Sequence, residues 1–250
     1  MGTPAPITFG DGTYHVGTDI PAGTYRTRVN SPGCVWTRLS GWSGQPSDII
    51  KRGTTDVTVV VTILGTDAGF TTQHCGTFTS DLSAITSSQT ANFGGGTYIV
   101  GTDIAPGTWR TSALTGPCFW ERLNAFGSPT DVITTDLSNG PAVVTISATD
   151  KGFYSENCTW TTNLAAITAS PTDPFGAGTY IVGTDIAAGT WTDTGGTGCV
   201  WARLSGFGGS GAEVIAPGPG GATTPENVTI LATDAGFKST PECGTWTKTG

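Results

Sequence analysis

The sequence predicts an all-β protein of three tandem small domains, each a β-sandwich or a partly open β-barrel with one internal disulfide. Three observations support this prediction. The stretch from Gly12 to Tyr25 occurs again at 96–109 and 178–191. The chain of 250 residues holds 38 glycines and 15 prolines among Thr- and Val-rich segments, and it shows no helical apolar period. Its 6 cysteines fall two to each repeat.

The repeat continues beyond this stretch. The pattern Cys-x-Trp-x-Arg-Leu follows at 34–39, 118–123 and 199–204, and Thr-Asp-x-Gly-Phe follows at 66–70, 149–153 and 233–237. From Phe9 to Phe93 the period is 84 positions (93 − 9), and from Phe93 to Phe175 it is 82 (175 − 93). Solenoid repeats span only about 20–50 residues, so each unit should close its own core. We expect domains at 1–80, 93–162 and 175–250, with linkers at 81–92 and 163–174.

In the first repeat the elements follow in order. Asp19 and Gly23 supply turn chemistry, because Asp bonds the backbone two residues on and Gly accepts a positive φ. The signature stretch is therefore a β-hairpin or a β-arch. Predicted strands lie at 13–16, 24–29, 34–39, 48–50, 56–64 (the longest) and 70–78.

The two linkers also resemble each other. Leu82 and Ile85 in the first correspond to Leu164 and Ile167 in the second. A free linker does not need such apolar residues, so we expect them to dock on a neighbouring domain and make the array semi-rigid. The segments that vary between repeats are expected to be loops, at 42–47, 126–130 and 207–212 and at 51–55, 134–141 and 216–226.

The cysteines indicate a disulfide framework. The repeat makes one pairing far more favourable than the others, with a bridge inside each domain. The expected pairs are Cys34 with Cys75, Cys118 with Cys158, and Cys199 with Cys243. Disulfides persist in oxidising environments, which places the protein outside the cytosol. A zinc site is disfavoured, since there is no Cys-x-x-Cys pair and the only histidines are His15 and His74.

Composition excludes several classes of partner. The net charge is −8, with scattered Lys and Arg, so no basic face is available for a nucleic acid. The longest β-type run, 57–64, is too short to cross a membrane. The N-terminus has neither the basic nor the apolar region of a signal peptide, so we expect either that one has been removed or that export uses another route. No cofactor or metal is expected.

Charged residues recur at fixed places in every copy. Asp19, Asp103 and Asp185 precede turn glycines, as do Asp67, Asp150 and Asp234. Backbone capping explains such aspartates better than acid–base catalysis or calcium binding, because the carboxylates come singly. Arg38, Arg122 and Arg203 each lie two residues beyond a tryptophan. We expect them to be structural, stacked on that indole and paired with Asp48, Asp131 and Glu213.

Two sets of aromatic residues are distinguished. Trp36, Trp120 and Trp201 are expected in the cores, against the disulfides. Trp42, Phe126 and Phe207 lie in the variable loops, where either core packing or binding of a sugar or protein partner would account for them. No catalytic serine, metalloprotease or cysteine–histidine motif is present, and we expect no enzymatic activity.

Taken together, these motifs resemble a repeat found in actinobacterial exported and surface proteins and in virion proteins of their phages. The resemblance covers nearly the whole chain and assigns no catalytic residues. It implies a non-enzymatic structural or adhesive protein located outside the cell. The pattern departs in the third repeat, where Thr192 replaces Arg26 and Arg110 of the earlier copies. That domain is therefore expected to be specialised or terminal.

Two interpretations of function share this fold. The first is a phage virion component, such as a capsid decoration or minor tail protein. On this interpretation it assembles with other virion proteins, and a homo-oligomer around a symmetry axis is expected. It depends on the apparent lack of an export segment. The alternative is an exported actinobacterial cell-surface or cell-wall-binding protein. A third interpretation is a lectin-like module or an enzyme that contacts cell-wall glycan through the loop aromatics.

Overall fold

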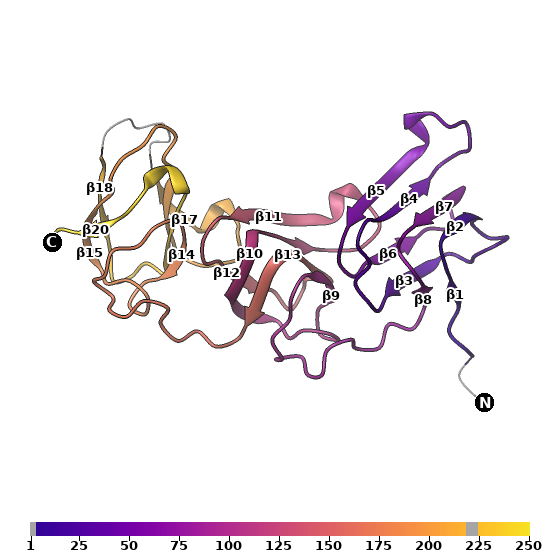
Figure 1. Cartoon of the computed structure of the whole chain (residues 1–250), viewed down its shortest axis with the longest axis horizontal. Helices are drawn as coiled ribbons and strands as arrows, with labels where there is room; N and C mark the ends of the chain where they lie inside the picture. The colour runs from indigo at the N-terminus through magenta and orange to yellow at the C-terminus, as the bar shows by residue number, and fades with distance from the viewer. Residues whose placement is uncertain (1–3, 219–224) are drawn as a thin grey trace.

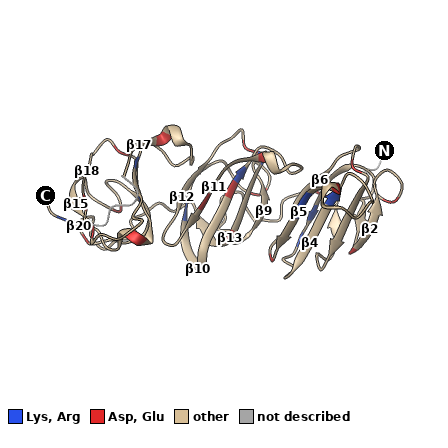
Figure 2. Cartoon of the chain, turned by 90° about the horizontal axis from the view of Figure 1, so that it is seen from above, with Lys and Arg blue, Asp and Glu red and all other residues tan. Residues whose placement is uncertain are grey.

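The structure, a computed structural model, describes residues 4–218 and 225–250. It consists of three β-domains in a row, with the two termini at opposite ends (Figure 1). The only helices in the described ranges are short 3-10 turns, at Pro46–Asp48, Pro129–Asp131, Gly211–Glu213 and Pro241–Cys243. The all-β prediction is confirmed. Charged residues are few and scattered along the ribbon (Figure 2).

The first domain is a sandwich of two antiparallel sheets. One sheet has the order β2-β7-β4-β5, formed by Gly12–His15, Gly69–Gln73, Cys34–Leu39 and Ile49–Thr55. The other has the order β1-β8-β3-β6, formed by Thr8–Phe9, Phe78–Thr79, Gly23–Thr27 and Val60–Ile63. Aromatic rings fill the space between them, among them Phe9, Tyr25 and Phe70. Burial of these rings is the main stabilising contribution.

The signature stretch is a β-arch and not a hairpin. Strand β2 pairs with β7, whereas β3 pairs with β6 and β8, so the chain crosses from one sheet to the other between them. Gly17 has φ 88°, a conformation that residues with a Cβ rarely adopt. The hydroxyl of Tyr25 donates to the carbonyl of Pro21 at 2.7 Å and fixes the corner.

The second and third domains repeat this plan. In the second, β3 and β4 have become one continuous strand, β10, which serves both sheets. Its strands are β9 (Gly96–Ile99), β10 (Gly107–Leu123), β11 (Val132–Ser138), β12 (Val143–Ile146) and β13 (Gly152–Thr161). Those of the third are β14 (Gly178–Ile181), β15 (Gly189–Thr192), β16 (Trp201–Leu204), β17 (Val214–Pro217), β18 (Asn227–Ile230), β19 (Gly236–Ser239) and β20 (Thr247–Lys248). Each domain has its own core.

Three expectations about strands were wrong. Residues 70–78 do not form one strand, because β7 ends at Gln73 and the chain passes to the other sheet, where Phe78–Thr79 forms β8. Residues 56–64 do not form the longest strand, because Asp56 accepts a hydrogen bond from the backbone of Gly33 at 2.7 Å and closes the end of the β4–β5 hairpin. Residues 51–55, expected as a variable loop, belong to β5, and 132–138 of the second repeat form β11. The loop predicted at 216–226 lies partly outside the described residues.

All three predicted disulfides are present. They join Cys34 to Cys75, Cys118 to Cys158 and Cys199 to Cys243. In the chain-entropy account, a closed loop of such length stabilises its domain by about 4 kcal/mol. Trp36, Trp120 and Trp201 are buried in the same clusters as these cysteines. Across the described ranges, no helix has the length and apolar character needed to cross a membrane.

Candidate functional site: the domain junctions

A buried ion pair joins the first domain to the second. Arg26, on β3, donates from both terminal nitrogens to the two carboxylate oxygens of Asp103, each at 3.0 Å. Neither side chain is exposed to solvent (0%/0%). The backbone N–H groups of Ile85, in the linker, and Ile99, on β9, also donate to this carboxylate, at 2.9 and 2.7 Å. Domain, linker and next domain therefore converge on one carboxylate, whose burial is compensated by four hydrogen bonds.

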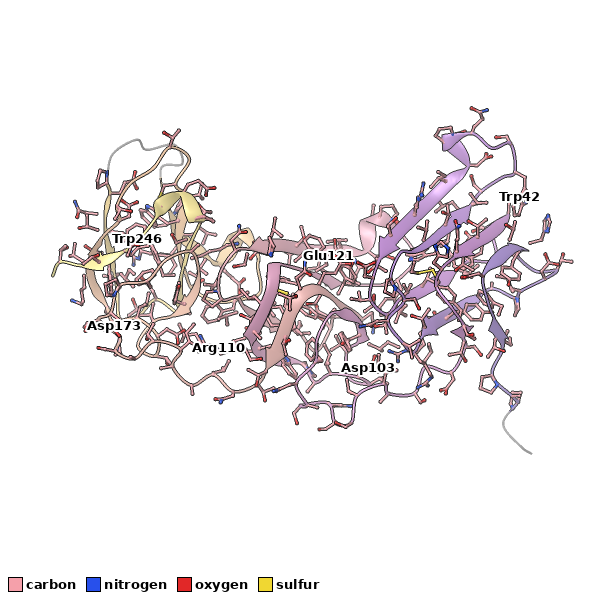
Figure 3. The ribbon with its side chains drawn as sticks, in the orientation of Figure 1. Trp42, Asp103, Arg110, Glu121, Asp173 and Trp246 are labelled. Atoms are coloured by element: carbon pink, nitrogen blue, oxygen red, sulfur yellow. A yellow bond between two sulfur atoms is a disulfide. The ribbon has the colours of Figure 1, made fainter. Side chains whose placement is uncertain are left out.

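The second junction repeats this arrangement residue for residue. Arg110 donates to the carboxylate of Asp185 at 3.1 and 2.6 Å, and the N–H groups of Ile167 and Ile181 donate at 3.1 and 2.8 Å. Arg110 also donates to the linker carbonyl of Ala165 at 2.7 Å. Asp103 and Arg110 lie along the side of the molecule where the linkers run (Figures 1 and 3). Each linker is thus bound to its junction by polar contacts.

The apolar linker residues dock only in part. Ile85 packs against the core of the second domain, and Leu82 and Leu164 are half-buried. The expectation was wrong for Ile167, whose side chain remains exposed while its backbone donates to Asp185. The second linker is held at this position by that backbone bond, by the bonds from Arg110 to the carbonyls of Leu164 and Ala165, and by the bond from Thr168 to the carbonyl of Asp185.

Asp19, the equivalent aspartate of the first domain, has no domain before it among the described residues and is exposed. It accepts from the backbone and the imidazole of His15 at 2.7 and 3.1 Å. The backbone bond, followed by the side-chain bond, lowers the pKa of Asp19. At the other end, Thr192 occupies the place of Arg26 and Arg110. Sequence reasoning assigned these aspartates to turn capping alone. The available signal for an Arg–Asp pair between domains was the absence of the arginine from the last repeat.

A second contact at each junction places a loop on an edge strand. The carbonyl of Phe126 accepts from the backbone N–H of Thr62 on β6 at 3.0 Å, and that of Phe207 accepts from Thr145 on β12 at 2.8 Å. Both strands are at the edge of their sheets, where outward N–H groups otherwise lack partners. A loop of the following domain therefore provides the hydrogen-bond acceptor for an outward N–H group of each edge strand.

Two of the three arginines that the sequence marked, Arg38 and Arg122, take part in this second contact. Arg38 donates to the carbonyl of Gly127, and Arg122 donates to that of Gly208 at 2.6 Å. All three guanidinium groups bind carboxylates within their own domains through Nε and a second terminal nitrogen. The pairs are Arg38 with Asp67, Arg122 with Asp150 and Arg203 with Asp234. One side chain thus connects its own domain to the next.

The expected partners of these arginines were wrong. Asp48, Asp131 and Glu213 instead accept backbone N–H groups of their own loops, as Asp131 does from Gly127 at 2.6 Å. Those acids are therefore used to shape the loops. The expected stacking on the indole is also absent from the described residues. The cation over Trp36 is Lys51, with Nζ 6.0 Å from the ring centroid.

The loop aromatics differ in their surroundings. Phe126 and Phe207 lie over Gly152 and Gly236, where a Cβ would collide with the ring, and their backbones carry the junction contacts. Trp42 covers Gly69 in the same way, yet it is 45% exposed and faces away from the array (Figure 3). Its ring centroid is 4.7 Å from that of His15. Packing explains the two phenylalanines, and Trp42 alone keeps a large exposed surface.

A cleft of about 370 Å³ opens between the first and second domains. Lys51 and Glu121 reach it from opposite domains, beside Trp36, Phe119 and Tyr154. Burial raises the pKa of Glu121 and of Tyr154. Burial also lowers the pKa of Lys51, against the opposing effect of Asp131 and Glu121.

The corresponding cleft between the second and third domains, of about 450 Å³, has different chemistry. Lys238 and Asp136 form an ion pair across it at 2.5 Å. The hydroxyl of Thr134 donates to the carbonyl of Gly209 at 2.9 Å. Lys238 and Asp136 of this cleft are therefore paired with each other, and Glu213 accepts backbone N–H groups of its own loop.

One group of potential metal ligands occurs in the described part of the chain: Asp193, Cys199 and Cys243. The two sulfurs form a disulfide, so they are not thiolate ligands. At each junction the buried carboxylate accepts four hydrogen bonds, whereas Nε of Arg26 and Nε of Arg110 have no hydrogen-bond partner among the described residues. A carboxylate engaged in this way is poorly suited to proton transfer. The junctions can hold domains in place and offer polar clefts.

Comparison with known proteins adds a family. Residues 7–79, 90–161 and 171–247 each match the family model described as the Rv1352-like extracellular domain. Uncharacterized protein Rv1352 of Mycobacterium tuberculosis (strain ATCC 25618 / H37Rv) and uncharacterized protein Mb1387 of Mycobacterium bovis are each 35% identical to the chain over 79 residues. The match takes in 26% of this chain and 64% of either relative, so the chain spans less than two thirds of their length. No solved structure matches the chain.

Proposed function

Because the chain belongs to the Rv1352-like extracellular domain family, we propose that it is a non-enzymatic protein of the bacterial cell surface that holds three extracellular domains in one rigid array. The array is adhesive or structural, and its partners are other surface proteins or cell-wall glycan. The family description and the mycobacterial relatives favour this interpretation over a virion component, for which neither comparison offers support.

The observation that carries the proposal is the repetition of the buried ion pair. Arg26 with Asp103 and Arg110 with Asp185 occupy equivalent places at two junctions. Two domains joined by a flexible linker do not need such a contact. If they moved independently, the arginine and the aspartate would be exposed to solvent. Removing one partner of such a pair costs about 3–5 kcal/mol, because the other charge is left buried without compensation. Each docked junction therefore depends on both of its side chains. The three disulfides fit the oxidising exterior in which such an array would work.

Mass spectrometry of the protein from its native source tests the location. Cell-surface and culture fractions and purified phage particles should be compared, with thiol alkylation before any reductant is added. We expect unalkylated protein with three intact disulfides in the surface or culture fraction. Recovery in phage particles would support the virion interpretation instead. Six alkylated cysteines, or a cytosolic location, would contradict the surface proposal.

A further inference from the structure

We propose that the cleft between the first and second domains binds one sugar unit of a saccharide, through Lys51 and Glu121. This inference gives the surface protein proposed above a class of ligand. The geometry that supports it does not depend on the cellular location, and neither does its test. Volumes of about 300–1,000 Å³ at domain interfaces are typical of small-molecule sites, and this cleft falls within that range.

Glu121 is the first group that is available to a ligand. Its side chain is half-buried on β10, and no hydrogen-bond donor or cation within residues 4–218 and 225–250 lies in contact with its carboxylate. Figure 3 places it at the first junction, opposite the side on which Asp103 lies. A partly desolvated carboxylate without donors is unfavourable, and the raised pKa of Glu121 is a consequence of that burial. Hydroxyl groups of a ligand would donate to this carboxylate in place of solvent.

Lys51 is the second group, and it comes from the opposite wall. Its Nζ donates to the carbonyl of Ser128 at 3.1 Å, which leaves two of the three ammonium donors for a ligand. The ring of Trp36 lies beneath it, with the centroid 6.0 Å from Nζ. Asp131, Glu121 and Arg38 are the charged groups that act on it most strongly. The ammonium is therefore held in place and still has free donors.

The remaining walls suit the apolar face of a sugar ring. Phe119 and Leu123 line the cleft, and the ring of Phe119 is held edge-on by Tyr154 at a centroid distance of 6.0 Å. Tyr154 itself is engaged with Thr55 and Glu156. A pyranose offers hydroxyl donors for Glu121, hydroxyl acceptors for Lys51 and C–H groups for these walls. The charged groups of the lining, Lys51, Arg52 and Glu121, can donate to and accept from such hydroxyl groups.

The second junction shows that these two charges are not needed to hold domains together. At the positions of Lys51 and Glu121, the next repeat in each case has Thr134 and Ala202. That junction nevertheless has the same arginine–aspartate pair and the same loop contact. Its own charges, Asp136 and Lys238, neutralise each other. Lys51 and Glu121 are thus not needed for docking of the domains. They occur only in the first cleft, where they do not form an ion pair with each other.

Binding by the full-length protein tests the proposal, with soluble maltotriose, galactotriose and tri-N-acetylchitotriose as probes. Isothermal titration and backbone amide NMR shifts measure it. Glu121→Ala and Lys51→Thr introduce the residues found at the equivalent positions of the next repeat, Ala202 and Thr134. Both variants should therefore fold, and dispersed amide spectra would show that they do. Asp136→Gly is the matched control in the second cleft, since the first domain has Gly53 there.

We expect saturable binding of at least one probe, with shifts centred on Phe119, Glu121 and Lys51. Affinity should fall at least about tenfold in Glu121→Ala and in Lys51→Thr, the loss of a hydrogen bond to a charged group. Asp136→Gly should bind as the unmodified protein does. Absence of saturable binding for all three probes would overturn the proposal, as would equal affinity in Glu121→Ala. Either failure leaves the surface location to be decided by fractionation.

Discussion

The two junctions of the array share their supports and differ in their clefts. Both have a buried arginine–aspartate pair on the linker side and a loop laid on an edge strand. In the first cleft Lys51 and Glu121 remain apart, whereas Asp136 and Lys238 close the second. The contacts that both junctions share set the geometry of the array. The charged residues that differ between the two clefts allow one junction to bind a ligand that the other does not.

The largest expected effect comes from removing one half of a buried pair. Asp103→Ala leaves the Arg26 guanidinium buried without its carboxylate, and we expect the free energy of unfolding to fall by about 3–5 kcal/mol. The matched control is Asp19→Ala, since Asp19 is exposed and its loss removes only the bonds to His15, which should cost about 1 kcal/mol. Urea denaturation followed by tryptophan fluorescence measures both. Equal stability of the two variants would show that the ion pair does not hold the junction.

Loss of a disulfide should be next in size and similar in each domain. The bridges close sequence separations of 41, 40 and 44 residues, so their entropic contributions are nearly equal. Replacing both cysteines of one bridge by alanine should cost about 2–5 kcal/mol. Calorimetry of the three double variants tests this expectation. A clearly smaller loss in the second domain, which both junctions brace, would show that docking compensates for the missing bridge.

The contact between loop and edge strand is expected to contribute less. Thr62→Pro removes the N–H that donates to Phe126, whereas Thr229→Pro removes the equivalent outward N–H of β18, for which the described residues offer no acceptor. Proline is tolerated at such outward edge positions. Thr62→Pro should be less stable than Thr229→Pro by about 1 kcal/mol, the value of one hydrogen bond. Equal melting temperatures would mean that this bond does not contribute.

The smallest effect concerns pH and distinguishes the first cleft from the second. Burial raises the folded-state pKa of Glu121 above its unfolded value, so its ionised form favours unfolding and reduces stability at neutral pH. Glu121→Gln should therefore be slightly more stable than the unmodified protein at pH 7. The advantage should disappear as pH falls below the unfolded-state pKa, where the glutamate is protonated in both states. Thermal melts from pH 3 to pH 7 measure the difference; an advantage that persists at pH 3 would contradict this account.

The fold was largely predictable because repetition reduces the number of solutions. Three copies of one pattern identified the domains, and two cysteines in each copy left a single favourable pairing. The strand limits were less predictable. Asp56 was placed inside a strand because the following residues are β-formers, but its carboxylate binds Gly33 and ends the hairpin. Alternation of apolar residues does not reveal such a side-chain bond.

The junctions could be predicted only in part. The linker pattern indicated docking, yet it pointed to apolar contacts, whereas the main support is polar. Arg26 and Asp103 are far apart in sequence, and each has a plausible local role. Arg38 was matched with Asp48 because the acid recurs, although Asp67 receives the guanidinium. Repeats reveal which residues are equivalent, but they do not reveal whether a contact forms within one domain or with the next.

Small-angle X-ray scattering of the full chain tests the rigid array most directly. We predict a distance distribution with distinct maxima at the spacings between domains, fitted by a single arrangement. The double variant Arg26→Ala/Arg110→Ala should lose these maxima while each domain keeps its disulfide. A smooth, broad distribution for the unmodified protein, unchanged in the double variant, would contradict the account by showing three domains that move independently.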